Sequence, residues 1–406
     1  MSSASNMATP PHTASSHWRV LGTACLAHVV HDGYSSMLYL LLPFWQREFT
    51  LTLAEIGILK TLYSAAMATG QIPAGSFGER HGERLPLVFG TLLTASAVFA
   101  LHSATTPVVL GLLLLVGGLG ASVQHPLAST AISKAYGGPA RRTILGTYNF
   151  AGDVGKMAIP GLLTVLIAGF GWPAGTQMVG VLGVVTAVIL LLGLAPGRRL
   201  PLGEGRRAAA PQPSLPPTVR RPGFAALSAI GALDSATRSG LLTFLPFILA
   251  AKGADTAAIG AALSLAFAGG AAGKFACGAL ANRIGILRTV ILTEAGTACA
   301  IMLMLVLSLP LSFILMPLLG IALNGTSSVL YGTVPELAPA GREARAFGLF
   351  YTVTIGADAV APTLYGAIGD WVGLPGAMLV VAAVVLLILP LTALLRPALR
   401  LCDGLS

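Results

Sequence analysis

Long, continuously apolar stretches recur along the whole chain and are separated by short polar segments. A helix needs about 20 apolar residues to cross the hydrocarbon core of a bilayer, and twelve stretches offer this. They lie at 18–44, 54–77, 85–102, 107–134, 143–168, 174–195, 223–250, 256–281, 286–308, 311–335, 345–369 and 375–396. The runs do not alternate with a two-residue period, which argues against a transmembrane β-barrel. The pattern predicts an all-α integral membrane protein with twelve transmembrane helices.

The polar segments divide the chain into two halves. Residues 196–222 are rich in arginine and proline, so we expect an extended cytoplasmic linker there. The predicted units are a disordered cytoplasmic tail at 1–17, a six-helix bundle at 18–195, the linker at 196–222, a second six-helix bundle at 223–396 and a cytoplasmic tail at 397–406.

The composition excludes several classes of soluble protein. The 406-residue chain is 55% hydrophobic and only 10% charged, whereas soluble chains carry about 25% charged residues. An ordinary soluble enzyme, a nucleic-acid-binding domain and a disordered scaffold are therefore excluded. No nucleophile–base set, P-loop or dinucleotide fingerprint is present in the sequence. We therefore expect no enzyme activity, no ATP-driven transport and no cofactor, with a proton gradient as the energy source.

Lysine and arginine are distributed unequally about the predicted spans. Of the 24 such residues, Arg47 and Lys252 fall on one side, four fall within spans, and all others fall on the opposite side. Short cytoplasmic loops carry an excess of these residues, so both termini are predicted to be cytoplasmic. The same asymmetry explains the net charge of +9 without a nucleic acid or another anionic partner; the expected partners are the bilayer, protons and a small solute.

The two halves repeat one another at a shift of about 203 residues. The matched positions are Asp32 with Asp234, Leu42-Pro43-Phe44 with Leu245-Pro246-Phe247, Gly75, Arg80 and Gly82 with Gly278, Arg283 and Gly285, and Asp153 with Asp358. Parallel repeats of this kind are typical of secondary transporters, whose substrate lies near the bilayer midplane between the halves.

Two loops at corresponding positions carry a family motif. Residues 75–84 read GSFGERHGER and residues 278–285 read GALANRIG. Both resemble the G-x-L-A-D-R-x-G-R loop of the major facilitator superfamily. The resemblance implies two pseudo-symmetric six-helix bundles and a loop that holds the cytoplasmic side shut by charge pairing; topogenic charge alone is the alternative. The gating residues it implies are Glu79, Arg80, Arg84, Asn282 and Arg283.

Two further segments are similar to one branch of that superfamily. HDGYSSMLYLLLP at 31–43 and GLGASVQHPLAS at 118–129 resemble the fosmidomycin-resistance branch, whose members are proton-coupled exporters. The chain departs from the branch at His31, at Leu127 and at 151–161, where two charges are added. The resemblance implies a monomeric, multi-pass exporter of a bacterial inner membrane with a substrate of its own.

Ionisable residues within the spans are functional candidates, because charge is costly at bilayer depth. His28, His31 and Asp32 share one helix face, and histidines near a carboxylate can titrate near neutral pH. We expect these three to carry the coupled proton, chiefly on Asp32 with the help of His31, because Asp32 has only titratable neighbours whereas Asp234 has Arg238 one turn away. A histidine packed against a backbone carbonyl is the alternative.

The other polar residues within the spans are expected to bind the substrate. They are His125, Asn149, Asp153, Lys156, Asp234, Arg238, Lys274, Asn324 and Asp358. The cations among them suit an anionic or zwitterionic solute, while the acids supply proton sites or bind an amine. The close pairs on single helices are alternatively neutralised pairs that lock a helix. Lys60 and Glu294 are expected near helix ends, where their side chains reach the interface.

These features predict a secondary active transporter that exports a small anionic or zwitterionic solute or drug in exchange for protons. Proton-driven uptake of a small organic acid is the alternative, because direction cannot be read from residues. A transition-metal or metal-chelate exporter using His28, His31, Asp32 and His125 is a further alternative, although we predict no resident metal. A receptor that does not transport is disfavoured, since no signalling domain accompanies the spans.

Overall fold

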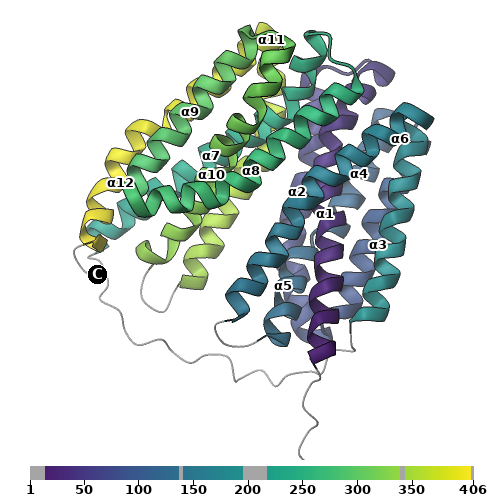
Figure 1. Ribbon diagram of the computed structural model, residues 1–406, viewed down its shortest axis with the longest axis horizontal. Coiled ribbons are helices and arrows are strands. Elements are labelled where there is room, and N and C mark those ends of the chain that lie inside the picture. The colour runs from purple at the N-terminus through teal and green to yellow at the C-terminus, as the bar shows by residue number, and fades with distance from the viewer. Residues whose placement is uncertain (1–13, 137–139, 195–216, 339–342, 404–406) are drawn as a thin grey trace, which may run out of the picture.

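The computed structural model describes residues 14–136, 140–194, 217–338 and 343–403, and every regular element in these ranges is a helix. The first half contains α1 (Ala14–Phe49), α2 (Leu53–His81), α3 (Arg84–Ala100), η1 (Leu101–Ser103), α4 (Pro107–Ala121), α5 (Gln124–Ala135) and α6 (Ala140–Gly193). The second half contains α7 (Pro217–Ala251), α8 (Thr256–Ile284), α9 (Ile286–Val306), α10 (Leu309–Leu337), α11 (Glu343–Leu386) and α12 (Ile388–Asp403). The two halves form two bundles that lie side by side (Figure 1).

Two of these elements each contain two helices joined at a glycine. Gly171 in α6 and Gly373 in α11 have φ values of 80° and 78°, in the region that disfavours other residues. Pro173 and Pro375 follow two positions later, within the first turn of the next helix, where proline is tolerated. The predicted spans on either side of each glycine are therefore separate helices, as the sequence indicates.

The described helices account for all twelve predicted spans. Seven segments are long and apolar enough to cross a membrane by length and composition alone. Two of them, Thr143–Gly193 and Arg345–Leu401, contain the glycine junctions and so supply two spans each. The remaining three spans are α1, α2 and α7, which are less apolar. α4 with α5 forms a single span, and α12 continues the second helix of α11.

The repeat extends to the backbone of the two motif loops. Gly82 and Gly285 have φ values of 84° and 88°. Each ends its helix by donating its N–H to a carbonyl four residues earlier, Gly78 at 2.8 Å and Ala281 at 2.9 Å. The shared motif therefore encodes the same sharp exit from α2 and from α8.

Three helices extend beyond their predicted limits. α1 begins at Ala14 inside the predicted tail, α7 begins at Pro217 inside the predicted linker, and α12 continues to Asp403 inside the predicted C-terminal tail. The helices run past the apolar spans because the membrane limits the apolar run and not the helix; the division into tails, bundles and linker stays a prediction. The rest of the predicted tails and linker lies outside the described residues.

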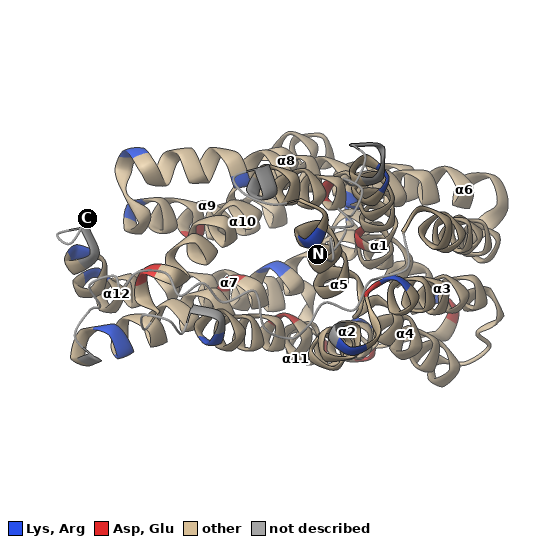
Figure 2. Ribbon diagram, turned by 90° about the horizontal axis from the view of Figure 1, so that it is seen from below, with Lys and Arg blue, Asp and Glu red and all other residues tan. Residues whose placement is uncertain are grey.

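The bundles touch most closely at the end of the molecule away from the start of α1. A Cβ atom at Gly57 of α2 would lie 2.2 Å from the carbonyl oxygen of Pro362 in α11, and one at Gly366 would lie 2.2 Å from that of Leu53. We call this the closed end. The bundles diverge toward the opposite end, where α1 begins (Figure 1). Viewed from there, α11 lies beside α2 (Figure 2).

Candidate functional site

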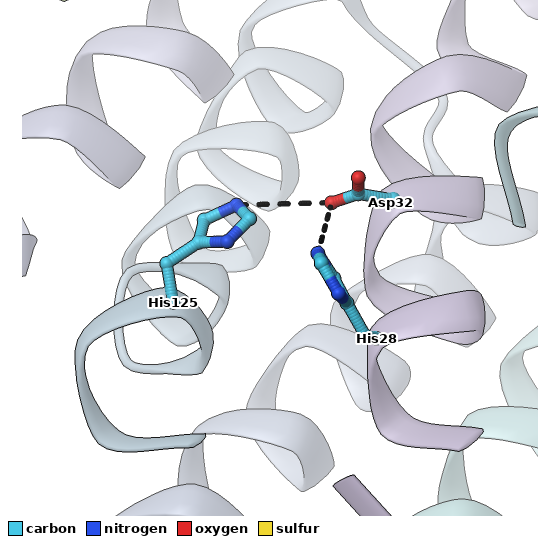
Figure 3. A group of neighbouring side chains, drawn as sticks. All are labelled: His28, Asp32 and His125. Carbon is cyan, nitrogen blue, oxygen red and sulfur yellow. Dashed lines mark ion pairs between the residues drawn. The ribbon is translucent and has the colours of Figure 1, made fainter. Parts of the chain in front are cut away.

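Asp32, near the middle of α1, is the centre of a cluster of ionisable side chains. Three imidazole nitrogens converge on its Oδ1 atom: His28 Nε2 at 3.4 Å, His31 Nε2 at 3.8 Å and His125 Nε2 at 3.7 Å. Figure 3 shows His28 and His125 approaching the carboxylate from α1 and α5. The other oxygen, Oδ2, lies 3.1 Å from Lys156 Nζ of α6. Asp32 therefore does not have only titratable histidine neighbours, and this prediction is wrong, because the lysine stem spans the gap between α6 and α1.

The second ring nitrogen of His28 fixes the tautomer of its neutral form. His28 Nδ1 lies 2.8 Å from the backbone carbonyl oxygen of Tyr148, and the two rings stack at 4.0 Å. A carbonyl only accepts hydrogen bonds, so Nδ1 carries the hydrogen. In a neutral ring Nε2 then presents a lone pair to the Asp32 carboxylate. The predicted alternative of a histidine bound to a carbonyl thus describes one nitrogen of His28 and leaves the other facing the acid.

A chain of ion pairs continues from this cluster into the second bundle. Lys156 Nζ lies 3.2 Å from Asp153 Oδ1. Lys274 Nζ of α8 lies 2.7 Å from both oxygens of Asp153. The order Asp32–Lys156–Asp153–Lys274 therefore alternates in sign and crosses from one bundle to the other. Asp153 with Lys156 is more than an isolated pair on one helix.

The acids and the bases of this chain differ in exposure. The aspartate side chains are each 9% exposed, whereas Lys156 is 32% and Lys274 is 37% exposed. The imidazole of His125 is 40% exposed. The two lysines and His125 therefore face space that solvent reaches, and the aspartates lie behind them.

Small residues on α6 allow this arrangement to form. A Cβ atom at Gly152 would lie 2.6 Å from Asp32 Oδ2, and one at Gly155 would lie 2.0 Å from the carbonyl oxygen of Val29. Small residues let membrane helices approach closely. The glycines therefore bring α6 against α1 at the level of Asp32.

A second cluster lies within the other bundle. Arg238 lies 3.5 Å from Asp234 on α7, and its guanidinium donates to Ser327 at 2.8 Å and to Ser235 at 3.2 Å. Glu294 of α9 is 1% exposed and interacts with Asp234 and Arg238. Arg238 is thus paired with Asp234, and Glu294 lies close enough to interact with both.

Glu294 and Lys60 do not reach the interface, so their prediction is wrong. Lys60 is 5% exposed, donates to Ser64 at 2.6 Å and lies 5.2 Å from the centre of the Tyr39 ring. Glu294 follows the Gly285 turn by nine residues, which is about 13 Å of helix at 1.5 Å per residue, too deep for the side chain to reach water.

The remaining predicted substrate residues are not all joined to these clusters. Asn149 is exposed, and Asn324 is partly buried, where its amide donates to Gly320 of its own helix at 3.3 Å. Asp358 is partly buried and interacts with Arg238 and Lys60. Its substrate role stays a prediction, as does that of the two asparagines.

The predicted gating residues lie near the end where α1 begins and form no described contact between the bundles. Arg80, Asn282 and Arg283 are exposed. Arg84 donates to the carbonyl oxygen of Leu191 at 3.1 and 2.5 Å. The side chain of Glu79 lies outside the described part of the chain. A gating role for these residues stays a prediction.

An ion pair made by a residue of the first motif loop was missed from the sequence. Glu83 is buried and pairs with Lys134 of α5. Both residues belong to the first bundle, so the pair fastens α5 to the start of α3. The only signal of this pair in the sequence is Glu83, the acid of the second GER in the motif.

His28, Asp32 and His125 also lie close enough to share a metal ion, since their ligand atoms are within 4.8 Å of one another. The donor set suits a transition metal. However, Lys156 already neutralises Asp32 from 3.1 Å, and its positive charge would repel a cation on the same carboxylate. We therefore assign no metal to the cluster.

Comparison with protein families gives a match along most of the chain. The family model described as Major Facilitator Superfamily matches residues 24–354 and 227–401. Over 172 residues the chain is 27% identical to the fosmidomycin resistance protein of Escherichia coli (strain K12), covering 42% of each protein. Over 146 residues it is 27% identical to a probable L-galactonate transporter of the same organism, covering 35% of this chain and 32% of that protein. The matched parts thus span less than half the length of these relatives.

The fold is shared with solved structures over nearly the full chain. A bacterial homolog of the human lysosomal transporter Spinster, in an inward-facing and unoccupied conformation, aligns with a TM-score of 0.78 and 16% identity. The alignment covers 97% of this chain and 99% of that one. At this identity the likeness shows the fold, and the fold is the predicted one.

Proposed function

The chain belongs to the Major Facilitator Superfamily and is a membrane transporter rather than an enzyme. We propose that it moves a small organic anion or zwitterion across a bacterial inner membrane by proton-coupled alternating access. The observation that carries the proposal is the ion chain Asp32–Lys156–Asp153–Lys274, which joins the two bundles. A substrate that binds there contacts both moving parts.

The exposure of the ion chain favours an anionic substrate. Lys156 and Lys274 are the exposed members and the aspartates are the buried ones. An incoming carboxylate or phosphonate can therefore replace Asp153 as the partner of Lys274 without first entering the buried region. The L-galactonate of one relative is a carboxylate, which agrees with this substrate class.

The histidines around Asp32 suit a proton site. In the neutral state the lone pair of His28 Nε2 faces a carboxylate oxygen at 3.4 Å. One added proton converts this contact into a charge-assisted hydrogen bond, which is about twice as strong as a neutral one. We therefore retain Asp32, His28 and His31 as the proposed proton carriers and add His125, whose Nε2 lies at a similar distance.

The direction of transport follows from how the proton and the substrate influence one another. The resemblance to a fosmidomycin resistance protein favours efflux by proton antiport, in which the two compete. The shared position of Lys156 favours a second candidate, uptake by symport. A proton on Asp32 releases Lys156 from that acid, so that proton binding strengthens anion binding.

The proposed orientation has both termini in the cytoplasm, because most lysines and arginines lie on that side of the spans. The closed end then faces the outside, and the site communicates with the cytoplasm. This arrangement is consistent with the exposure of Lys156, Lys274 and His125 at the middle of the molecule.

The test is counterflow in proteoliposomes with a panel of organic anions, including L-galactonate and fosmidomycin. We expect Lys274→Gln to lose most of the exchange, while the control Lys252→Gln, outside the site, retains it. Equal exchange in both variants would remove the ion chain from the substrate site. Binding measured at two pH values gives the coupling: stronger binding at low pH indicates symport, and weaker binding indicates antiport.

A further inference from the structure

We propose that a cavity between α7 and α11 binds the headgroup of an anionic phospholipid of the cytoplasmic leaflet. The cavity has a volume of about 690 Å³, is open on one side, and is lined by the beginning of α7, the end of α10 and the beginning of α11. All three helix ends lie at the end of the molecule where α1 begins. The leaflet assignment rests on the proposed orientation, whereas the binding itself does not.

Three guanidinium groups line one end of the cavity. They belong to Arg220 and Arg221, near the start of α7, and to Arg345, near the start of α11. The cavity therefore gathers three positive charges at neighbouring helix starts, which is the charge complement of a phosphate.

The walls become apolar with distance from the arginines. On α11, Arg345, Leu349 and Val353 follow one another at four-residue spacing, so they line one helix face. The face runs about 12 Å along the helix axis at 1.5 Å per residue. On α7, Phe224 lies one turn beyond Arg220. Leu349 is 55% and Val353 is 36% exposed.

This order of charge and apolar surface matches a phospholipid better than a soluble anion. A headgroup phosphate can pair with the arginines while the first methylenes of an acyl chain contact Leu349 and Val353. A soluble anion would use only the charged end. Basic pockets between helices on the cytoplasmic side are places where anionic headgroups bind.

The cavity is separate from the proposed transport site. It is lined by residues of α7, α10 and α11, whereas the ion chain is built from α1, α6 and α8. None of the three arginines belongs to the proposed substrate, proton or gating residues. Changes in the cavity can therefore be made without touching the ion chain, and a failure of the lipid proposal is distinguishable from a failure of the transport proposal.

The experiment measures lipid retained by the purified full-length protein in detergent. Phosphatidylglycerol and phosphatidylcholine of the same acyl chains are titrated in, and bound lipid is counted by native mass spectrometry. The test variant is Arg220→Gln/Arg221→Gln/Arg345→Gln. The control is Arg288→Gln/Arg396→Gln/Arg400→Gln, which removes three described arginines that do not line the cavity. Thermal unfolding checks that both variants are folded.

We expect the wild type and the control to prefer phosphatidylglycerol. The cavity variant should lose that preference by on the order of 100-fold, because each of the three basic residues near an anionic surface contributes about a fivefold factor. Leu349→Asn/Val353→Asn should weaken lipid binding while leaving the headgroup analogue glycerol 1-phosphate unaffected.

Three results would overturn the proposal. The first is equal retention of both lipids by the wild type. The second is an equal loss of preference in the cavity variant and the control. The third is glycerol 1-phosphate binding as tightly as phosphatidylglycerol, which would identify the cavity as a site for soluble anions.

Discussion

Lys274 of the second bundle holds both carboxylate oxygens of Asp153 of the first bundle at 2.7 Å. Because the partners belong to different bundles, a relative rotation of the bundles changes this contact. Lys156 holds the same acid from its own helix at 3.2 Å. Asp153 therefore keeps a cation when Lys274 leaves it. Lys274 can then bind a substrate anion without leaving the aspartate unpaired.

A double-mutant cycle measures the strength of this contact between the bundles. Asp153→Asn should lower the stability more than Asp153→Asn/Lys274→Gln does, because the single change leaves Lys274 without its acid, whereas Lys156 keeps Asp32. We expect a coupling of about 1 kcal/mol, within the range for contacting residues and modest because the lysine is partly exposed. Thermal unfolding in one detergent provides the measurement. Additive effects of the two changes would contradict a direct interaction.

Asp32 and Asp234 occupy equivalent places in the repeat, and their substitution should separate coupling from binding. We expect Asp32→Asn to lose accumulation driven by a pH gradient but to keep much of the exchange without a gradient, because only the proton site is removed. Asp234→Asn should retain the dependence on the gradient, since Arg238 and its serine partners remain. Full accumulation by Asp32→Asn in proteoliposomes would move the proton site to Asp153 or Asp358.

The spans and the fold were predictable because they depend on apolar length, which the sequence displays directly. The predicted family is confirmed by the match along the chain. The ion chain was only partly predictable. Asp153 and Lys156 are neighbours on one helix, whereas Lys274 joins them from a helix more than a hundred residues away. Helix spacing cannot reveal such a contact.

The depth of a residue within a helix was a second source of error. Lys60 and Glu294 were expected to reach the interface, although the predicted spans begin at 54 and 286, within one residue of the starts of α2 and α9. The structure buries both, and each finds polar or charged neighbours that lie on other helices. The error therefore lay in the reach assigned to the two side chains and not in the span boundaries.

The close approach of α1 and α6 makes Gly155 sensitive to the smallest substitution. A Cβ atom there would lie 2.0 Å from the backbone oxygen of Val29, which cannot move without the helix. We expect Gly155→Ala to destabilise the protein by about 1–3 kcal/mol, as for other overpacked sites, and to reduce transport. The measurements are thermal unfolding and counterflow. Gly146→Ala on the same helix is the control, because no heavy atom lies within 4 Å of its Cβ position, and equal effects would contradict the packing argument.

The closed end of the molecule is held by a helix cap that crosses between the bundles. The first two N–H groups of α2, at Leu53 and Ala54, donate to Asp370 of α11 at 2.7 and 2.9 Å. Such groups have no partner within their own helix, and a carboxylate at a helix N-terminus is also favoured by the helix dipole. Asp255 performs the same task for α8 but within its own bundle, where it accepts from Ala258 at 2.7 Å.

This difference gives a matched pair of variants. Asp370→Ala should favour the conformation in which the bundles separate at this end, since the cap is lost only there. A lost cap costs about 0.5–2 kcal/mol, so the ratio of the two conformations should change by about 2- to 30-fold. Asp255→Ala should lower the stability by a similar amount without changing that ratio, because Asp255 and Ala258 belong to the same bundle and move together.

Spin labels at Thr105 and Ala251, one in each bundle, report the separation as a distance distribution. If both variants leave the distribution unchanged, Asp370 caps a helix without holding the closed end; if both broaden it equally, general destabilisation explains the effect and the crossing cap does not.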